Sequence, residues 1–179
     1  MTPTFHTLKI AEIKRETEET ISVSFEIPDD LKKSYAYKSG QYLTLRTTID
    51  GEDLRRSYSL CSAPHENEWR VAIKKVELGK FSTYANDSFQ VGDEIQVMTP
   101  MGNFTADIQA TNAKNYVFFA SGSGVTPVFS LIKSILENEP NSNVTLFYGN
   151  KRFGTIIFRE ELEALKNEHL DKFTLTHVL

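Results

Sequence analysis

The pattern of apolar residues changes near residue 111, and this change constrains the fold of the 179-residue chain more than any other feature. Before it, apolar and polar residues alternate in short runs, as in the segment from Ile21 to Ile27. After it, continuous apolar runs take turns with stretches in which apolar residues recur every three or four positions. The first pattern is typical of half-buried strands, and the second of strands and helices in succession. The sequence therefore predicts a β-rich half followed by an α/β half.

Short strands separated by turns indicate a closed or nearly closed antiparallel barrel over residues 5 to about 108. The candidate strands carry alternating apolar residues: Ile21, Val23, Phe25 and Ile27, Leu43 and Leu45, Val71 and Ile73, and Ile95 and Val97. The candidate turns contain glycine: Gly40, Asp50-Gly51, Gly79, Gly92-Asp93 and Met101-Gly102-Asn103. We expect a hairpin at Asp50-Gly51 and one or two helical turns between Phe81 and Phe89.

The polar stretch from Thr111 to Lys114 is the expected boundary between two domains, residues 1–110 and residues 111–179. The second domain has the order β-α-β-α-β, with strands at 116–120, 144–148 and 173–179 and helices at 128–136 and 159–167. Its first strand is an unbroken apolar run, typical of a parallel strand that is covered on both faces. Since no helix follows the last strand, we expect one bare face there, and either a C-terminal truncation or another chain or segment that completes the sheet.

The overall composition excludes several classes of protein. A formal net charge of −4 and a pI near 5.6 argue against nucleic acid as the main partner. The only cysteine, Cys61, excludes an internal disulfide or a multi-cysteine metal site, and we expect it to be a small buried residue. The four histidines show no spacing typical of metal ligands, so we expect no metal. No apolar run has the length of a membrane span, so the expected location is the cytoplasm.

The segment from Arg55 to Leu60 is the first candidate binding site. Side chains alternate across a strand, so Arg56 and Tyr58 share one face while Ser57 and Ser59 share the other. A guanidinium group binds phosphate oxygens, and an aromatic ring stacks on a flat heterocycle. The pair therefore suits a nucleotide-like cofactor, although the alternative of a half-exposed strand with solvated arginines remains open.

The segment from Ser121 to Pro127 is the second candidate site, because it lies between a predicted strand and a predicted helix. Its two glycines permit close approach of a ligand, Thr126 is a plausible N-cap, and Pro127 suits the first helical position. The helix amides would then face a pyrophosphate. The alternative is an ordinary glycine turn.

The next strand ends without the acidic residue that receives a ribose diol in the dinucleotide fingerprint. Lys151 and Arg152 stand there instead and suit a 2′-phosphate, so NADPH is favoured over NADH. A solvated basic loop is the alternative.

A third candidate site lies between Ile73 and Ser82. Gly79 would turn the chain there, and a short helix would begin with residues 80–82, whose amides could bind another pyrophosphate.

With these three segments in this order, the chain resembles the ferredoxin–NADP⁺ reductase family, and within it the reductases of oxygenase systems. The resemblance covers nearly the whole chain, and its most specific part is the Arg-x-Tyr-Ser pattern at residues 56–59. It implies a six-stranded antiparallel flavin-binding barrel followed by a partial parallel-sheet domain that binds a nucleotide. The implied cofactors are FAD and either NADPH or NADH.

The resemblance also implies roles for individual residues. Arg56 would pair with the flavin pyrophosphate, Tyr58 would stack on the isoalloxazine ring, and Ser59 would lie near flavin N5, which makes Tyr58 and Ser59 the expected catalytic residues. The other residues expected at the flavin are Ser57, Ile73, Lys74, Lys75, Gly79, Lys80, Phe81 and Ser82. Those expected at the nicotinamide nucleotide are Gly122, Gly124, Thr126, Pro127, Gly149, Asn150, Lys151 and Arg152.

By the same resemblance, a hydride would pass from NAD(P)H to flavin N5, and electrons would leave singly to an iron–sulfur, ferredoxin-like domain or protein that feeds an oxygenase. The family's Cys-Gly-Pro stretch near the nicotinamide, the segment that follows it, and the iron–sulfur domain have no counterpart before Leu179. Two alternatives stay open: a flavin-binding module without reductase turnover, and a β-barrel that binds an oligonucleotide or a protein.

Overall fold

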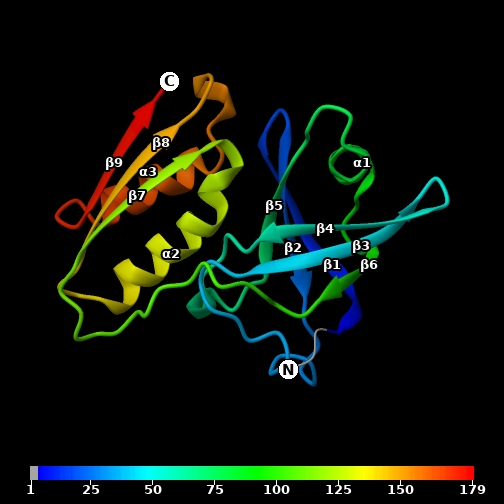
Figure 1. Ribbon diagram of the computed structural model, residues 1–179, viewed down its shortest axis with the longest axis horizontal. Coiled ribbons are helices and arrows are strands. Elements are labelled where there is room, and N and C mark those ends of the chain that lie inside the picture. The colour runs from blue at the N-terminus through cyan, green and yellow to red at the C-terminus, as the bar shows by residue number, and fades with distance from the viewer. Residues whose placement is uncertain (1–3) are drawn as a thin grey trace.

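The computed structural model describes residues 4–179, in which a six-stranded antiparallel sheet lies beside a three-stranded parallel sheet (Figure 1). The first sheet has the order β4-β3-β6-β1-β2-β5. Its strands are β1 (Phe5–Thr17), β2 (Thr20–Glu26), β3 (Tyr42–Ile49), β4 (Glu52–Ser59), β5 (Arg70–Lys74) and β6 (Glu94–Met98). A bridge between Leu60 and Val71 joins the end of β4 to β5 and nearly closes the sheet. The predicted barrel is therefore confirmed.

Local sequence explains how this barrel turns. Asp50 and Gly51 both have positive φ, 51° and 78°, as the type I′ turn of a two-residue hairpin requires, and β3 pairs with β4 from Ile49↔Glu52 onward. The expected helical turns are present as α1 (Lys80–Ser88), and a 3₁₀ turn, η1 (Pro64–Glu66), follows β4.

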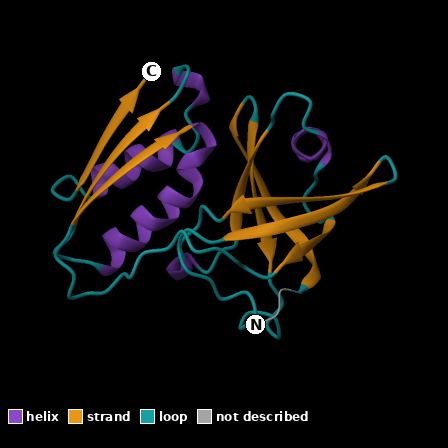
Figure 2. Cartoon of the chain, in the orientation of Figure 1, coloured by secondary structure: helices purple, strands orange, loops and turns teal. Residues whose placement is uncertain are grey.

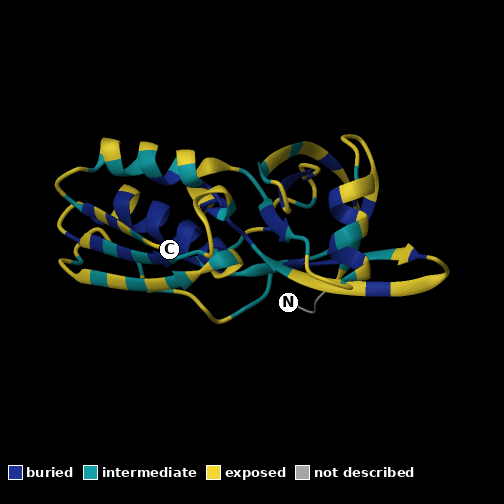
Figure 3. Ribbon diagram, turned by 90° about the horizontal axis from the view of Figure 1, so that it is seen from above, coloured by how far each residue is buried: buried dark blue, intermediate teal, exposed yellow. Residues whose placement is uncertain are grey.

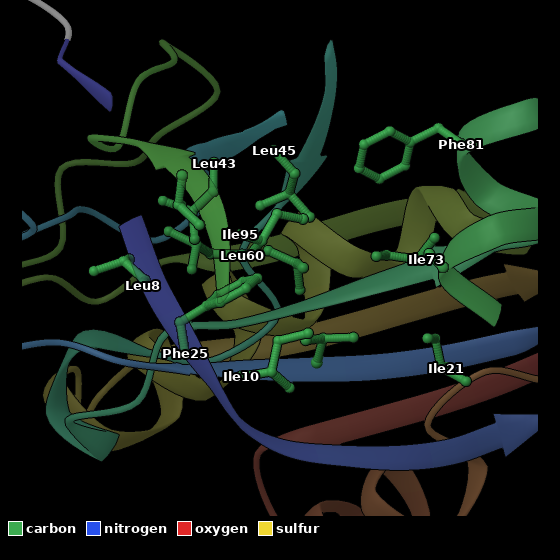
Figure 4. Packing of buried hydrophobic residues seen from close by; sticks show 14 of the residues in the cluster. Leu8, Ile10, Ile21, Phe25, Leu43, Leu45, Leu60, Ile73, Phe81 and Ile95 are labelled. Atoms are coloured by element: carbon green, nitrogen blue, oxygen red, sulfur yellow. The ribbon is translucent and has the colours of Figure 1, made fainter. Parts of the chain in front are cut away.

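The alternating apolar residues of the barrel strands point inward and form one core (Figure 4). All of the residues that marked the predicted strands are buried, and Phe81 of α1 joins them. The core thus fixes the register of the strands, since a slip by one residue would turn these side chains to solvent.

The second sheet has the order β7-β8-β9 and confirms the predicted β-α-β-α-β succession (Figure 2). Its elements are β7 (Asn115–Ser121), η2 (Gly122–Gly124), α2 (Val125–Asn138), β8 (Asn143–Gly149), η3 (Phe153–Thr155), α3 (Arg159–Glu168) and β9 (Phe173–Val178). The expected domain boundary at residues 110 and 111 falls in the segment between β6 and β7.

The prediction that the first parallel strand is covered on both faces is wrong. Val117 and Phe119 of β7 are 54% and 77% exposed, and Phe119 stacks on Phe147 of β8 at 5.2 Å between ring centroids. Both helices lie on the other face (Figure 3). The strands follow one another in chain order, so crossovers of the same hand place their helices on the same side of the sheet.

Several contacts join the barrel to α2. Cys61 and Ala72 of the barrel domain are buried against the helix within the second core. The Ser130 hydroxyl donates to the Ser62 carbonyl at 2.6 Å, and the Lys133 ammonium lies 2.5 Å from the Glu66 carboxylate. These contacts hold α2 against β5 and against the segment that joins β4 to β5. No helix in residues 4–179 is long and apolar enough to cross a membrane.

Candidate functional site

The strand β4 separates its two arginines as alternation predicts. Arg56 lies on the side of Leu54 and Tyr58, and its Nη1 donates to the Arg55 carbonyl at 2.7 Å. Arg55 lies on the opposite side, where its guanidinium carbon is 5.5 Å from the centroid of the Phe5 ring. The Arg56 side chain is exposed, so it is free to reorient toward an anion beside Tyr58.

Tyr58 connects this strand to α1. Its ring is half-buried and lies 5.9 Å from the ring of Phe81, the second residue of the helix. Burial raises the pKa of Tyr58 to about 12, and the positive charge of Arg56 opposes this rise only in part. The phenol is therefore neutral at physiological pH and presents a flat, uncharged ring next to a guanidinium group.

The turn before α1 is built to leave its amides free. A Cβ on Gly79 would come within 2.4 Å of the Val76 side chain and 2.6 Å of the Ser82 hydroxyl, so only glycine fits. The amide of Thr83 bonds to the Gly79 carbonyl, which leaves the amides of residues 80–82 without a partner inside the helix. No acidic residue stands in the first helical turn, so the helix dipole favours an anion there.

The side chains of this turn already have partners within the barrel domain. Phe81 is in the core, and the Ser82 hydroxyl accepts from the Val76 amide at 3.2 Å and donates to the Gly79 carbonyl at 3.2 Å. The ammonium of Lys80 pairs with Glu52 on β4 at 2.5 Å. Phe81 and Ser82 are thus available to a ligand through their backbone amides and not through their side chains.

Replacing Ser82 with alanine should disturb this turn. The partly buried hydrogen bond from the Val76 amide to the Ser82 hydroxyl would be lost, so we expect the free energy of unfolding to fall by about 1 kcal/mol and flavin affinity to fall with it. Chemical denaturation and flavin titration of the Ser82→Ala variant measure both effects. Thr83→Ala, one residue along the same helix, is the control. An equal loss of stability and flavin affinity in both variants would contradict the role of the Ser82 hydroxyl in this turn.

Residues Ile73 to Lys75 lie beside this turn at the end of β5. Ile73 is fully buried, and its carbonyl accepts from the Asn86 side chain of α1 at 3.0 Å. Lys74 is half-buried, and the ammonium of Lys75 pairs with Asp87 of α1 at 2.8 Å. The end of β4 therefore lies beside the start of β5, where Leu60 bridges Val71, while the end of β5 packs against the last turn of α1.

The glycine loop follows β7, but the helix starts earlier than predicted. It begins at Val125, with Gly124 as the N-cap, so the expectation that Thr126 caps the helix and Pro127 opens it is wrong. The chain runs through the 3₁₀ turn η2 straight into α2, because Gly124 already has right-handed helical angles. The Thr126 hydroxyl donates back to the Ser123 carbonyl at 2.5 Å, and Pro127 sits in the first turn, where a missing amide costs no helical bond.

The loops that follow β7 and β8 lie together at the carboxyl ends of these strands, where Ser121 pairs with Gly149. Positions Gly122 and Gly124 face open space, because a Cβ at either would meet no atom within 4 Å. The same loop contacts β5, so it lies next to the flavin segments. This is the crevice where open α/β sheets bind ligands.

Asn150 stands in this crevice directly after β8. Its side-chain amide is buried beside Tyr148, and within residues 4–179 neither its oxygen nor its nitrogen has a hydrogen-bond partner of good geometry. Lys151 and Arg152 follow and are exposed. A buried amide without a partner is suited to a polar ligand group.

The predicted residues do not line a cleft of about 700 Å³ elsewhere in the chain. That cleft lies at the far end of α2, beside Ser134 and Asn138, and is bounded by Tyr37 to Ser39 and by Asp107. The free helix amides of α1 and the Tyr58 ring lie elsewhere, so this cleft does not coincide with the predicted cofactor site.

Sequence reasoning missed Tyr148, which is fully buried in β8 and whose hydroxyl donates to the Gly122 carbonyl at 2.9 Å. The available signal was a phenol at the end of a largely apolar strand, one residue before Gly149. Buried tyrosine hydroxyls usually have a hydrogen-bond partner, so this one indicated a fixed contact at the strand end.

Two domain families match the chain. The oxidoreductase FAD-binding domain matches residues 7–106, and the oxidoreductase NAD-binding domain matches residues 118–179. These matches confirm the expectation of FAD and a nicotinamide nucleotide as cofactors.

Similar proteins of known sequence include a component of the 1,2-phenylacetyl-CoA epoxidase from Escherichia coli K12, which is 38% identical over 96% of this chain and 48% of its own length. The ferredoxin reductase component of 3-ketosteroid-9-alpha-monooxygenase from Rhodococcus rhodochrous is 34% identical over 96% of this chain and 48% of its own length. The chain thus spans about half the length of these curated relatives.

Solved structures share the fold. Ferredoxin–NADP⁺ reductase from Plasmodium falciparum with 2′P-AMP has a TM-score of 0.82 at 19% identity, over 97% of this chain and 72% of its own. A ferredoxin NADP⁺ reductase from Neisseria gonorrhoeae with bound FAD and NADP has a TM-score of 0.78 at 23% identity, over 97% of this chain and 67% of its own. The chain therefore shares the fold of ferredoxin–NADP⁺ reductases, and it belongs to the family of oxidoreductase FAD-binding domains, with an oxidoreductase NAD-binding domain after it.

Proposed function

We propose that the chain is the flavin- and nicotinamide-binding part of a reductase that oxidises NAD(P)H and delivers electrons to an iron–sulfur, ferredoxin-like centre serving an oxygenase. The observation that carries this proposal is that the Tyr58 ring lies beside Phe81 at the free amides of α1, while the glycine loop contacts β5, the neighbour of β4. The names of the two curated relatives, an epoxidase component and a monooxygenase reductase component, support an oxygenase partner. The predicted location remains the cytoplasm, and the predicted domains remain residues 1–110 and 111–179.

The barrel residues would hold FAD by three means. The Arg56 guanidinium and the amides of residues 80–82 would bind its pyrophosphate, and the Gly79 turn leaves these amides free. Tyr58 would stack on the flat ring system, and residues 73–75 would line the side of the cofactor next to β5. The hydroxyls of Ser57 on β4 and Thr44 on β3 share a hydrogen bond of 2.9 Å, so Ser57 would contribute by holding β4 in place.

When bound, FAD supplies the ability to accept electrons in pairs and release them singly. Tyr58 would fix the plane of the ring, and the Ser59 hydroxyl would place a hydrogen-bonding group at its reacting edge. Both residues lie at the end of β4, where the bridge at Leu60 holds the strand against β5. The chain's contribution is thus positioning, and no pair of acid and base side chains is needed.

The second domain would hold the nicotinamide nucleotide. The open side of Gly122 and Gly124 would admit its pyrophosphate, and Thr126 and Pro127 would shape the loop. Residues 149–152 would bind the adenosine end, where the unpaired Asn150 amide is a ready partner. Lys151 and Arg152 favour NADPH over NADH, because two cations suit the additional phosphate.

The test is the reduction of a [2Fe–2S] ferredoxin by the FAD-loaded protein, with NADPH and NADH as alternative donors. We expect reduction by both nucleotides, with a lower KM for NADPH. Flavin bleaching without ferredoxin reduction would contradict the proposed acceptor. If neither nucleotide reduced the bound flavin, the protein would be a flavin-binding module without reductase turnover. If the protein did not bind flavin, the alternative of a barrel that binds an oligonucleotide or a protein would be favoured.

A further inference from the structure

The glycine loop of the second domain is tied to its central strand by a single phenol. Tyr148 of β8 is fully buried, and its hydroxyl donates to the Gly122 carbonyl at 2.9 Å while accepting from the Ile157 amide at 3.3 Å. Gly122 opens η2, and Ile157 lies just before α3. One side chain therefore bonds both the loop after β7 and the segment before α3.

The hydrogen-bond direction is fixed by these partners. Because the Ile157 amide can only donate, the hydroxyl must turn its own proton toward the Gly122 carbonyl. Burial raises the pKa of Tyr148 to about 12, so the phenol keeps this proton throughout the physiological range. The donated hydrogen bond is thus available at any physiological pH.

The loop needs such a contact. Gly122 has a φ of +50°, it is followed within two residues by Gly124, and neither position packs against a neighbouring side chain. Within the loop the Val125 amide donates to the Gly122 and Ser123 carbonyls, but glycines lose more conformational entropy on ordering than other residues, so a further restraint is useful. Tyr148 and the Thr126 hydroxyl, which donates to the Ser123 carbonyl, restrain it from the protein side.

We propose that Tyr148 is a positioning residue for the nicotinamide nucleotide. By holding Gly122, its hydroxyl keeps the glycine loop preorganised for the pyrophosphate, so that a ligand need not order the loop on binding. This inference rests on the proposed nucleotide site but concerns a residue beneath the site that would not touch the ligand. It adds a determinant of nucleotide affinity that flavin binding does not share.

The test compares Tyr148→Phe with Tyr116→Phe in the FAD-loaded protein. Tyr116 is the matched control, because its hydroxyl donates to the Glu139 carboxylate at 3.1 Å from the opposite end of β7. For Tyr148→Phe we expect the Kd for NADP⁺, measured by calorimetry, to rise about three- to tenfold, the usual effect of one lost hydrogen bond. The KM for NADPH should rise in step, while kcat at saturating NADPH and the flavin content stay unchanged.

Amide hydrogen exchange provides a readout that does not depend on any nucleotide. The amides of residues 123–125 should exchange faster in Tyr148→Phe than in the wild type, and should be unaltered in Tyr116→Phe. Unchanged exchange in Tyr148→Phe, or an equal rise in Kd in both variants, would overturn the inference. A wild type that binds neither NADP⁺ nor NAD⁺ would defeat the proposed function, while the exchange measurement would still decide whether Tyr148 positions the loop.

Discussion

Replacing Arg56 with alanine is expected to weaken FAD binding by about 10- to 150-fold, since a charge-assisted hydrogen bond contributes about 1.5–3 kcal/mol. Arg56 is exposed and shares a strand face with Tyr58, whose ring lies 5.9 Å from that of Phe81 in the first turn of α1. Its hydrogen bond to the Arg55 carbonyl is with an exposed group, so it can be exchanged for a phosphate at little cost. Flavin titration followed by fluorescence measures the change.

Arg55→Ala is the matched control for this prediction. The two residues are adjacent in sequence and carry the same charge, but Arg55 lies on the other face, near Phe5 and 3.4 Å from Asp53. We expect its removal to change FAD affinity only slightly. If both variants lost affinity equally, the effect would come from net charge and not from a directed contact, and the assignment of Arg56 would be wrong.

Replacing Arg70 with methionine is expected to lower the free energy of unfolding by about 3 kcal/mol, the lower end of the range for breaking a buried ion pair. Arg70 of β5 binds Glu161 of α3 with two hydrogen bonds, at 2.6 and 3.2 Å, and its side chain is only 12% exposed. Lys14 also reaches Glu161, at 2.8 Å. Removal of Arg70 would leave the Glu161 carboxylate partly buried and poorly paired, and would loosen α3 from the barrel.

The pH dependence of this pair distinguishes it from a packing effect. Burial tends to raise the pKa of Glu161, but the hydrogen bond and charge of Arg70, with help from Lys14, outweigh burial and lower it. A lowered pKa in the folded state means that the pair stabilises above the unfolded pKa of about 4.3 and is lost as pH falls through the folded value. The difference in stability between the wild type and Glu161→Gln, measured by denaturant titration, should therefore be full at pH 7 and shrink below pH ~4.

The exposed pair of Lys75 and Asp87 is the control for Arg70. Its two side chains are 38% and 52% exposed, so Lys75→Met should cost no more than about 1 kcal/mol. A loss for Arg70→Met no larger than that for Lys75→Met would show that the buried network adds nothing to stability.

The sequence predicted most of the barrel because its signals are local. Alternation identified the strands, and Asp50-Gly51 identified the hairpin, since both residues accept the positive φ that this turn needs. Alternation also assigned Arg56 and Arg55 to opposite faces. The expected burial of Cys61 is confirmed as well.

Other features depend on tertiary structure and could not be predicted in this way. The bond between Arg70 and Glu161 joins residues 91 positions apart, and no local pattern connects them. The true start of α2 depends on the conformation of Gly124, which the sequence leaves free, so Thr126 was misplaced as the cap. The bare face of β7 follows from the order of the three strands, while the apolar run alone only indicated burial.

An anaerobic titration of the FAD-loaded protein with NADPH, followed by visible absorbance, tests the central claim most directly. The ring beside Tyr58 and the nucleotide at the glycine loop should lie in one crevice, so we predict that the oxidised flavin absorbance disappears as NADPH is added. The same titration of Arg56→Ala should show a protein that has lost much of its flavin before any nucleotide is added. A wild type that keeps its full flavin absorbance under excess NADPH and NADH would contradict the claim that these two sites work together.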